Sequence, residues 1–331
     1  MRKRLFSALL ALCILLTLCS CTAQNQSNKD AKLTILCTLF PQYDWLRNIT
    51  AGVDGVEVSL IIANGTDPHS YQPTAADIMN ISNCDMLVYV GGDSENWVKK
   101  AIERSKNKNI NAIALTALEG ITLHDISASS HTHEGHDHGE HSHEGHEHSS
   151  LDEHLYLSLD NACAAVGALA NALCKADPDN RDAYLKNSLE YTLKLANMSE
   201  GFRAEVEQIP AEERFILFAD RFPFVYLLSD YGIHYSAAFE GCTTDVDADF
   251  DTVIRLIHES DEHDVSYIAV TEGSDKALAN TIITSTKSKN QKIVVLNSMQ
   301  AITKSQIENG STYISIMKEN IDQVKTALGL S

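Results

Sequence analysis

The chain of 331 residues is 44% apolar and has a formal net charge of −19, so it can bury a full hydrophobic core, and its length suggests two lobes. Its acidity argues against nucleic acid as a partner. Of its eight cysteines, the five beyond Cys21 are scattered without a CxxC pair, which argues against a dense disulfide framework and against a cysteine zinc site.

Residues 1–20 are predicted to be a lipoprotein signal peptide. A basic start precedes an apolar run over residues 5–18, which is too short for a transmembrane span. The run ends in LCSC, which resembles the bacterial lipobox, and on that resemblance Cys21 would carry the lipid. Residues 21–31 are polar and predict a flexible tether. We therefore expect an extracytoplasmic lipoprotein that is anchored to the bacterial cell membrane.

Residues 32–178 are predicted to form an N-terminal α/β lobe. The strand-like segments KLTILCTLFP, VEVSLIIANG and DMLVYVGG alternate with the helix-like segments QYDWLRNITAG, TAADIMNISNC and NWVKKAIERSKN. In the second of these helices, Thr74 and Asp77 have the spacing of a capping box, with Asp in place of the usual Glu. This alternation of strands and helices predicts a parallel sheet.

A histidine-rich run interrupts this lobe over residues 129–150. It contains no aliphatic or aromatic residue, so it cannot offset the entropy of its own ordering. Neutral imidazole binds zinc, copper and nickel, so closely spaced histidines predict weak, multiple and exchangeable metal sites. A pH-sensing role is the alternative. The predicted metal-capturing residues are His131, His133, His136, His138, His141, His143, His146 and His148.

A long amphipathic segment follows, and residues 179–209 are predicted to be a connecting helix. Strand-like and helix-like segments then alternate again, so residues 212–331 are predicted to form a C-terminal α/β lobe. The predicted fold is α/β, with two βα lobes whose central sheets are rich in parallel strands and which a long rigid helix joins. Ligands of such folds bind at the carboxyl ends of strands, so we expect the site in the cleft between the lobes.

Two histidines lie where such a site would form. His69 follows Pro68 in NGTDPHSYQPTAAD, a loop between the second predicted strand and a helix. His154 lies in LDEHLYLSLDNA, directly after the histidine-rich run. Each histidine taken alone is typical of an ordinary surface loop, and it is their combination that indicates a metal site.

The two segments resemble the signature motifs of one family. GTDPHSYQPTAAD is similar to the motif G-x-x-P-H-x-Y-x-P-T-x-x-D of the cluster A-I (cluster 9) solute-binding proteins, which serve zinc and manganese ABC uptake transporters. DEHLYLSLDNA resembles the family's D-x-H-x-W motif, with Tyr156 in place of Trp, and many zinc-specific members have a loop rich in histidine and acid before that motif. NGSTYISIMKENID resembles the closing helix of the family. The resemblance covers nearly all of the mature chain.

The resemblance implies two α/β lobes bridged by a long helix and one metal ion in the cleft. His69 and His154 match two of the family's ligands, and the second lobe usually supplies a third histidine. In the matching segment FADRFPFVYLLSDYG, Phe224 and Tyr226 align with the family's Phe and Tyr, which puts Arg221 at the position of that histidine. Arginine stays protonated and cannot bind a metal ion.

A carboxylate of the second lobe is therefore predicted to replace the missing imidazole. Asp220 is the first choice, Glu272 and Glu240 are further candidates near predicted strand ends, and Cys242 is a fourth. Two imidazoles with one or two carboxylates still suit zinc. Such a site is harder than a three-histidine site and therefore shifts the preference somewhat toward manganese.

We expect a monomeric receptor that captures a divalent ion, Zn²⁺ before Mn²⁺, and delivers it to an ABC permease and its ATPase without a bond-making reaction. The histidine-rich run would raise the occupancy of the cleft, and capture should weaken below about pH 6.5, because only neutral imidazole binds metal. A manganese or iron receptor of the same family and a metal buffer or chaperone without a transporter are the alternatives. A secreted zinc hydrolase is a third, for which no motif supplies both an open coordination position and a general base.

Overall fold

The computed structural model describes residues 32–125, 151–240 and 248–330. The signal peptide, the tether with Cys21, the eight histidines of residues 129–150, Cys242 and the side chain of Glu240 lie outside the described residues, so the predictions for them stay predictions. Within the described ranges, no helix is both long enough and apolar enough to cross a bilayer.

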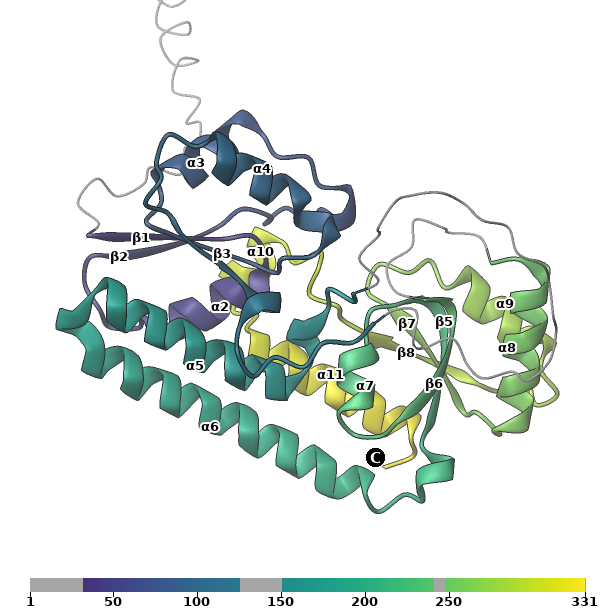
Figure 1. Ribbon diagram of the computed structural model, residues 1–331. Helices are drawn as coiled ribbons and strands as arrows, with labels where there is room; N and C mark the ends of the chain where they lie inside the picture. Colours follow the sequence, from purple (N-terminus) through teal and green to yellow (C-terminus); the bar gives the residue numbers. More distant parts are fainter. Residues whose placement is uncertain (1–31, 126–150, 241–247, 331) are drawn as a thin grey trace, which may run out of the picture. The chain divides into compact units, whose positions relative to one another are not determined.

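The first lobe is built on a four-stranded parallel sheet with the strand order β2-β1-β3-β4. Helices α3 and α4 cover one face, where Leu36, Ile81 and Leu87 belong to a small core, and α2 covers the other face (Figure 1). The predicted capping box is confirmed, because Thr74 caps α3 and the Asp77 side chain accepts from the Thr74 backbone N–H. The elements are β1 (Leu33–Cys37), α2 (Phe40–Ile49), β2 (Val56–Leu60), α3 (Ala75–Asn83), β3 (Met86–Tyr89), α4 (Asn96–Arg104) and β4 (Asn111–Ala114).

The second lobe repeats this topology. Its parallel sheet has the order β6-β5-β7-β8, so the first strand of each lobe again lies between the second and the third. Helices α8 and α9 cover one face, and α7 and α11 cover the other (Figure 1). In both lobes the strand order reverses beside the first strand, which is where open α/β sheets present their ligands. The elements are β5 (Phe215–Phe222), α7 (Val225–Ser229), β6 (His234–Glu240), α8 (Phe250–Glu262), β7 (Tyr267–Thr271), α9 (Ala277–Ser285), β8 (Lys292–Leu296) and α11 (Tyr313–Ala327).

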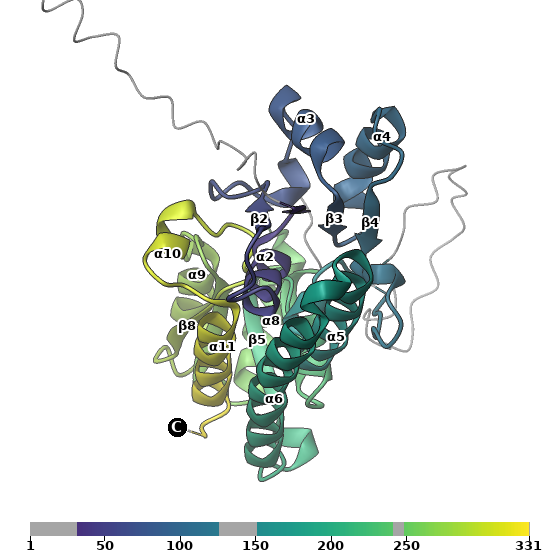
Figure 2. The same cartoon turned by 90° about the vertical axis from the view of Figure 1, so that its left-hand side faces the viewer.

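A pair of helices joins the two lobes. Helix α5 (Leu159–Ala176) packs along α6 (Arg181–Val206), and α6 then leads to the first strand of the second lobe (Figures 1 and 2). The 26 residues of α6 span about 39 Å at 1.5 Å per residue. The predicted α/β fold with two lobes joined by a long helix is confirmed.

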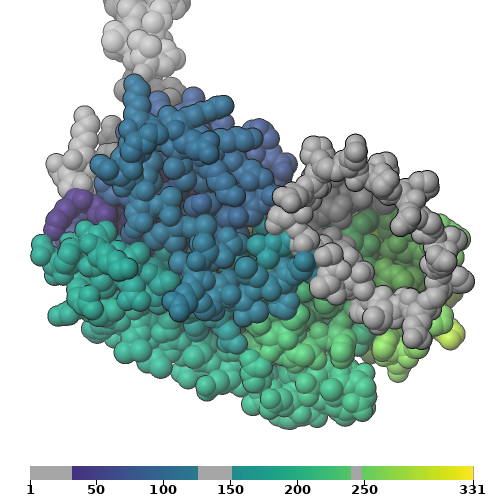
Figure 3. Space-filling view, viewed as in Figure 1, coloured from purple at the N-terminus to yellow at the C-terminus, as the bar shows by residue number. Residues whose placement is uncertain are grey.

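The lobes share one hydrophobic core. Tyr313, at the start of α11, stacks its ring edge-on against Trp45 of α2 at a centroid distance of 5.2 Å. Its hydroxyl donates to the carbonyl of Tyr156 at 2.7 Å, and its backbone N–H donates to Asp44 at 3.1 Å. The space-filling view shows the first lobe, the paired helices and the second lobe in continuous contact (Figure 3). Hinge opening between the lobes would therefore have to break this core.

The chain also crosses back to the first lobe after β8. Thr303 forms an antiparallel bridge with Asn64, and the backbone N–H of Lys304 donates to the carbonyl of Ala63 at 2.7 Å. Short helix α10 (Lys304–Glu308) begins at this crossing. The local sequence does not predict this contact. Because of it, residues 297–303 cross the cleft between the lobes.

Glu95 is a buried carboxyl group at the strand-order reversal of the first lobe. Only 1% of the residue is exposed, and its Oε2 accepts the backbone N–H of Gly91 at 2.9 Å. Burial raises the pKa of Glu95 to about 7, and the charge of Glu153 adds to that rise. Because this pKa lies above its ordinary value in the unfolded chain, the folded state holds the proton more tightly. The stability that this proton provides is full below about pH 4.5 and is lost as the pH rises through about 7.

Glu95→Gln should therefore gain stability relative to the wild type as the pH rises. We expect the difference in free energy of unfolding between the two proteins to grow by about 1 to 3 kcal/mol between pH 5 and pH 8. Urea denaturation of metal-free protein at both pH values measures it, with the exposed Glu103→Gln of α4 as the control. A difference that does not change with pH would contradict the assignment.

Candidate metal centre

His69 lies in the loop that follows β2. It is the middle residue of a single 3₁₀ turn (Pro68–Ser70), and Asp67 caps that turn by accepting the backbone N–H of His69 at 2.9 Å. Pro68 fixes the first backbone angle of the turn. The loop therefore presents the imidazole from a stiff backbone.

An aspartate two residues earlier in the chain holds His154, as Asp67 does for His69. Asp152 Oδ1 accepts both the backbone N–H of His154 and its ring Nδ1–H, each at 2.8 Å. Both residues are buried, with 2% and 3% exposed. Because the carboxylate holds the proton on Nδ1, the lone pair of Nε2 points away from Asp152 and can bind a metal ion. A tyrosine of the second lobe supports the turn, since the hydroxyl of Tyr226 donates to the carbonyl of Asp152 at 2.7 Å.

The fold brings these two histidines together. Their ring centroids lie 5.8 Å apart, although 85 positions separate them in the sequence. Each is the third residue of an Asp-x-His turn, DPH in one loop and DEH in the other. Asp67 and Asp152 were not among the predicted site residues, although the repeated Asp-x-His spacing was a signal for both.

Gln300 comes from the segment that crosses the cleft and meets His154. Its side-chain Nε2 lies 3.1 Å from Nε2 of His154. Since His154 already donates from Nδ1, its Nε2 is the acceptor and the amide of Gln300 is the donor. No local pattern points to Gln300, because its contact with His154 depends on the crossing of residues 297–303.

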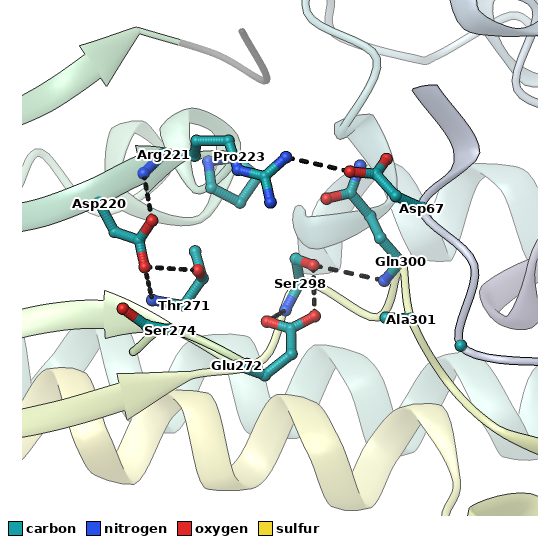
Figure 4. Close-up of a pocket in the computed structure, with 12 residues that line it drawn as sticks. Asp67, Asp220, Arg221, Pro223, Thr271, Glu272, Ser274, Ser298, Gln300 and Ala301 are labelled. Carbon is teal, nitrogen blue, oxygen red and sulfur yellow. Dashed lines mark hydrogen bonds and ion pairs between the residues drawn. The ribbon is translucent and has the colours of Figure 1, made fainter. Parts of the chain in front are cut away.

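A cavity of about 260 Å³ is lined by Asp67 and Gln300, which contact His69 and His154 (Figure 4). One wall comes from the loop of His69 and the other from the strand ends of the second lobe, so the cavity lies between the lobes. Its lining residues are Gly65, Asp67, Asp220, Arg221, Pro223, Thr271, Glu272, Gly273, Ser274, Ser298, Gln300 and Ala301. The predicted candidates Asp220 and Glu272 both belong to this lining.

Donors of the second lobe already engage both carboxylates. Asp220 accepts from the backbone N–H of Arg221 at 2.8 Å and from the hydroxyl of Thr271 at 2.8 Å. Glu272 accepts from the backbone N–H of Ser298 at 2.8 Å and from its hydroxyl at 2.5 Å. Burial raises the pKa of Glu272, and the neighbouring Asp220 raises it further, while the bonds from Ser298 oppose the rise.

Arg221 reaches across the cavity to the first lobe. Its Nη1 donates to Asp67 Oδ2 at 3.0 Å, and Figure 4 shows the guanidinium directed toward that carboxylate. One carboxylate oxygen of Asp67 therefore accepts the backbone N–H of His69, and the other forms an ion pair with Arg221 of the second lobe. The side chains of Arg221 and Asp67 stay 39% and 33% exposed, so solvent reaches this pair.

The described residues provide two imidazoles for a metal ion, and no three His, Cys, Asp or Glu side chains among them are grouped to hold one. Zinc in proteins usually takes four ligands. Asp220 and Glu272 accept these hydrogen bonds and still keep lone pairs for a metal ion, as ligating carboxylates commonly do. Their ligation of the ion stays a prediction.

Three of the four remaining described histidines have these surroundings. His124 packs edge-on against the ring of Tyr226, with the ring centroids 4.7 Å apart, and His263 stacks on Phe215 at 3.9 Å. His258 lies on the surface of α8, 3.4 Å from Glu262.

Comparison with protein families gives one match that covers almost the whole described chain. Residues 35–327 match the family described as "Zinc-uptake complex component A periplasmic". The chain is 31% identical over 309 residues to the high-affinity zinc uptake system protein ZnuA of Bacillus subtilis, covering 93% of this chain and 92% of that protein.

Two further similarities involve Streptococcus pneumoniae. The zinc-binding lipoprotein AdcA of strain R6 is 30% identical over 325 residues, which cover 98% of this chain and 60% of AdcA. The chain thus spans only part of the length of this relative. The crystal structure of the Zn(II)-bound ZnuA-like domain of AdcA superimposes with a TM-score of 0.69 at 25% identity, covering 90% of this chain and 99% of that domain.

Proposed function

The chain belongs to the family of zinc-uptake complex component A proteins, and from this premise we propose that it is an extracytoplasmic receptor that captures Zn²⁺ in the cleft between its lobes. The convergence of His69 and His154 beside a cavity between the lobes carries the proposal. In this role the protein is a solute receptor and has no catalytic step.

The first lobe would form the fixed half of the metal site. Asp67 and Asp152 hold the two histidine turns, and the proton on Nδ1 of His154 leaves Nε2 to face the metal. Gln300 would have to move or turn its amide oxygen toward the ion, because its N–H group now faces that nitrogen. The second lobe would then supply Asp220 or Glu272 as the exchangeable half.

The histidine-rich run would act as an accessory collector. The residues on either side of the run are paired through their backbones near the cleft. Asp125 forms an antiparallel bridge with Leu151, and the backbone N–H of Asp152 donates to the carbonyl of His124 at 2.9 Å. The last of the eight histidines, His148, lies only four residues before Asp152 in the sequence. Ions bound there would be at high effective concentration for the cleft.

Delivery would involve an ABC permease and its ATPase, with the receptor held at the membrane as a monomer through lipid on Cys21. The shared core around Tyr313 opposes a wide hinge motion. Release would therefore involve exchange of the second-lobe ligands and of the Arg221–Asp67 ion pair.

The test is a zinc titration of a variant that lacks residues 130–149. Because Asp125 and Leu151 are paired at the base of the run, this deletion should close without disturbing the lobes. We expect one tight zinc ion that excess manganese does not displace. His69→Ala or His154→Ala in this background should weaken it more than about 100-fold, because the loss of a ligand exceeds the usual cost of changing a residue that orients one.

The exposed His258→Ala of α8 is the matched control and should leave zinc binding unchanged. Loss of all binding on deletion of the run would favour a metal buffer. Displacement by stoichiometric manganese would favour a manganese receptor.

A further inference from the structure

Helix α6 carries an exposed row of leucines, which we call the leucine stripe. Leu185, Leu189 and Leu193 follow one another at every fourth position, so they lie on one side of the helix. They are 36%, 60% and 53% exposed. We propose that the leucine stripe rests on the surface of the phospholipid bilayer to which the chain is tethered. This inference goes beyond metal capture, and it rests on the predicted lipid on Cys21.

The stripe lies on the side of α6 that faces away from the shared core. The opposite side packs into that core through Tyr184, Tyr191 and Leu195, and Figure 1 shows α6 along an outer edge of the molecule. Of the eight large apolar residues that are exposed in the described part of the chain, three form this stripe. Single exposed apolar residues are ordinary in soluble proteins, whereas a contiguous row indicates a contact surface.

The predicted tether joins the described structure beside the start of α6. It ends at Lys32, whose Nζ lies 3.2 Å from Asp177 and 3.3 Å from Asp179, in the short connection that leads into α6. The 11 residues of the tether, 21–31, span at most about 40 Å. That length exceeds the diameter of a helix, about 10 to 12 Å, so a lipid on the first tether residue allows α6 to lie flat on the bilayer.

The charge next to the stripe suits an anionic phospholipid surface. The chain as a whole has a net charge of −19, so an anionic bilayer repels most of it. Residues 181–197 differ, because their charged side chains are all exposed and the basic ones outnumber the acidic ones. They are Arg181, Lys186 and Lys194 against Asp182 and Glu190. Lysines beside the leucines can lay their stems on the apolar surface and keep the ammonium group among the headgroups.

A bilayer fits this stripe better than a second copy of the chain does. Stable protein interfaces bury about 800 Å² per partner, far more than three partly exposed leucines provide. A tethered bilayer needs less contact, because the tether holds it at a high effective concentration. The contact also leaves the metal centre accessible, since α5 and α6 contribute none of the residues that line the cavity between the lobes.

The test uses the lipoprotein purified from bacterial membranes and reconstituted in vesicles of phosphatidylcholine and phosphatidylglycerol with brominated acyl chains. Bromine quenches tryptophan only at close range, so Leu189→Trp reports on the stripe. Met79→Trp is the matched control, because Met79 is 63% exposed on α3 of the first lobe. After subtraction of the fluorescence of the unsubstituted protein, we expect quenching about threefold stronger for Leu189→Trp than for Met79→Trp, since an interfacial helix buries its apolar face at the acyl boundary.

Adding Leu185→Ser and Leu193→Ser to Leu189→Trp should remove this excess quenching. Zinc affinity should stay unchanged, which shows that the fold is intact. Equal quenching at the two positions would overturn the proposal. So would a dimer of unlipidated Cys21→Ser protein in sedimentation that Leu189→Ser dissociates, because the stripe would then join two copies. Mass spectrometry that finds no lipid on Cys21 would overturn the anchor and this proposal together, while the zinc titration decides the receptor function separately.

Discussion

Asp152→Asn is expected to weaken zinc binding in the cleft about tenfold, and Asp152→Ala up to about 100-fold. Asp152 Oδ1 accepts two N–H groups of His154, one from the backbone and one from the ring. Asparagine can keep one oxygen at this position, so it preserves the turn but removes the negative charge that makes the imidazole a better donor. Alanine removes the turn as well and frees the ring to adopt the tautomer with its proton on Nε2.

The measurement is zinc affinity by competition with a chromophoric chelator, in the variant that lacks residues 130–149. Asp182→Asn, an exposed change at the start of α6, is the control. Zinc affinity that is the same in Asp152→Ala and the wild type would show that His154 needs no orienting carboxylate, or that it is not a ligand. The free energy of unfolding of each metal-free variant identifies any loss that comes from the fold.

Gly91→Ala is expected to lower the free energy of unfolding by about 2 to 4 kcal/mol, since backbone strain and overpacking each cost about 1 to 3 kcal/mol. Gly91 has a φ of +101°, a conformation that residues with a side chain avoid. An added Cβ would lie 2.5 Å from Oγ1 of Thr116 and 2.9 Å from Cβ of Ala114. Neither atom is the end of a long flexible side chain, so the backbone would have to move.

That movement should reach the metal centre. The backbone N–H of Gly91 donates to Glu95, and three residues after Gly91, Ser94 binds the carboxylate of Glu153 through both its backbone and its hydroxyl. Glu153 precedes His154, so we expect zinc binding to weaken together with stability.

Gly167→Ala is the matched control, because Gly167 lies inside α5 with nothing within 4 Å of an added Cβ. It should raise the free energy of unfolding by about 0.5 to 1 kcal/mol. Urea denaturation of both variants measures the contrast. Equal effects at the two glycines would mean that the positive φ and the close approach at Gly91 have no energetic cost.

The two Asp-x-His turns suggest how one short pattern serves two purposes. In both, the aspartate fixes the backbone of the histidine two residues later. Asp152 then directs its carboxylate to the ring of its own histidine, whereas Asp67 directs its second oxygen to Arg221 of the other lobe. The first arrangement prepares a metal ligand, and the second ties the metal loop to the lobe that would exchange ligands.

The sequence by itself determined the features that depend on neighbours along the chain. The period of apolar residues predicted alternating strands and helices and hence two parallel sheets. Thr74 and Asp77 predicted a helix start, because a capping box needs only residues three apart. The motifs around His69 and His154 predicted a shared site because their patterns match one family, and the structure places the two rings side by side.

Only the tertiary structure decided what completes the site. The contacts of Arg221 with Asp67 and of Gln300 with His154 join residues 154 and 146 positions apart. No local pattern encodes such pairs, because they depend on how two lobes and a crossing segment pack. Sequence could place Asp220 and Glu272 near strand ends, but whether their oxygens were already engaged depended on Thr271 and Ser298 of neighbouring strands and loops. The donors that a carboxylate meets are set by packing, and they decide how it is oriented toward a metal ion.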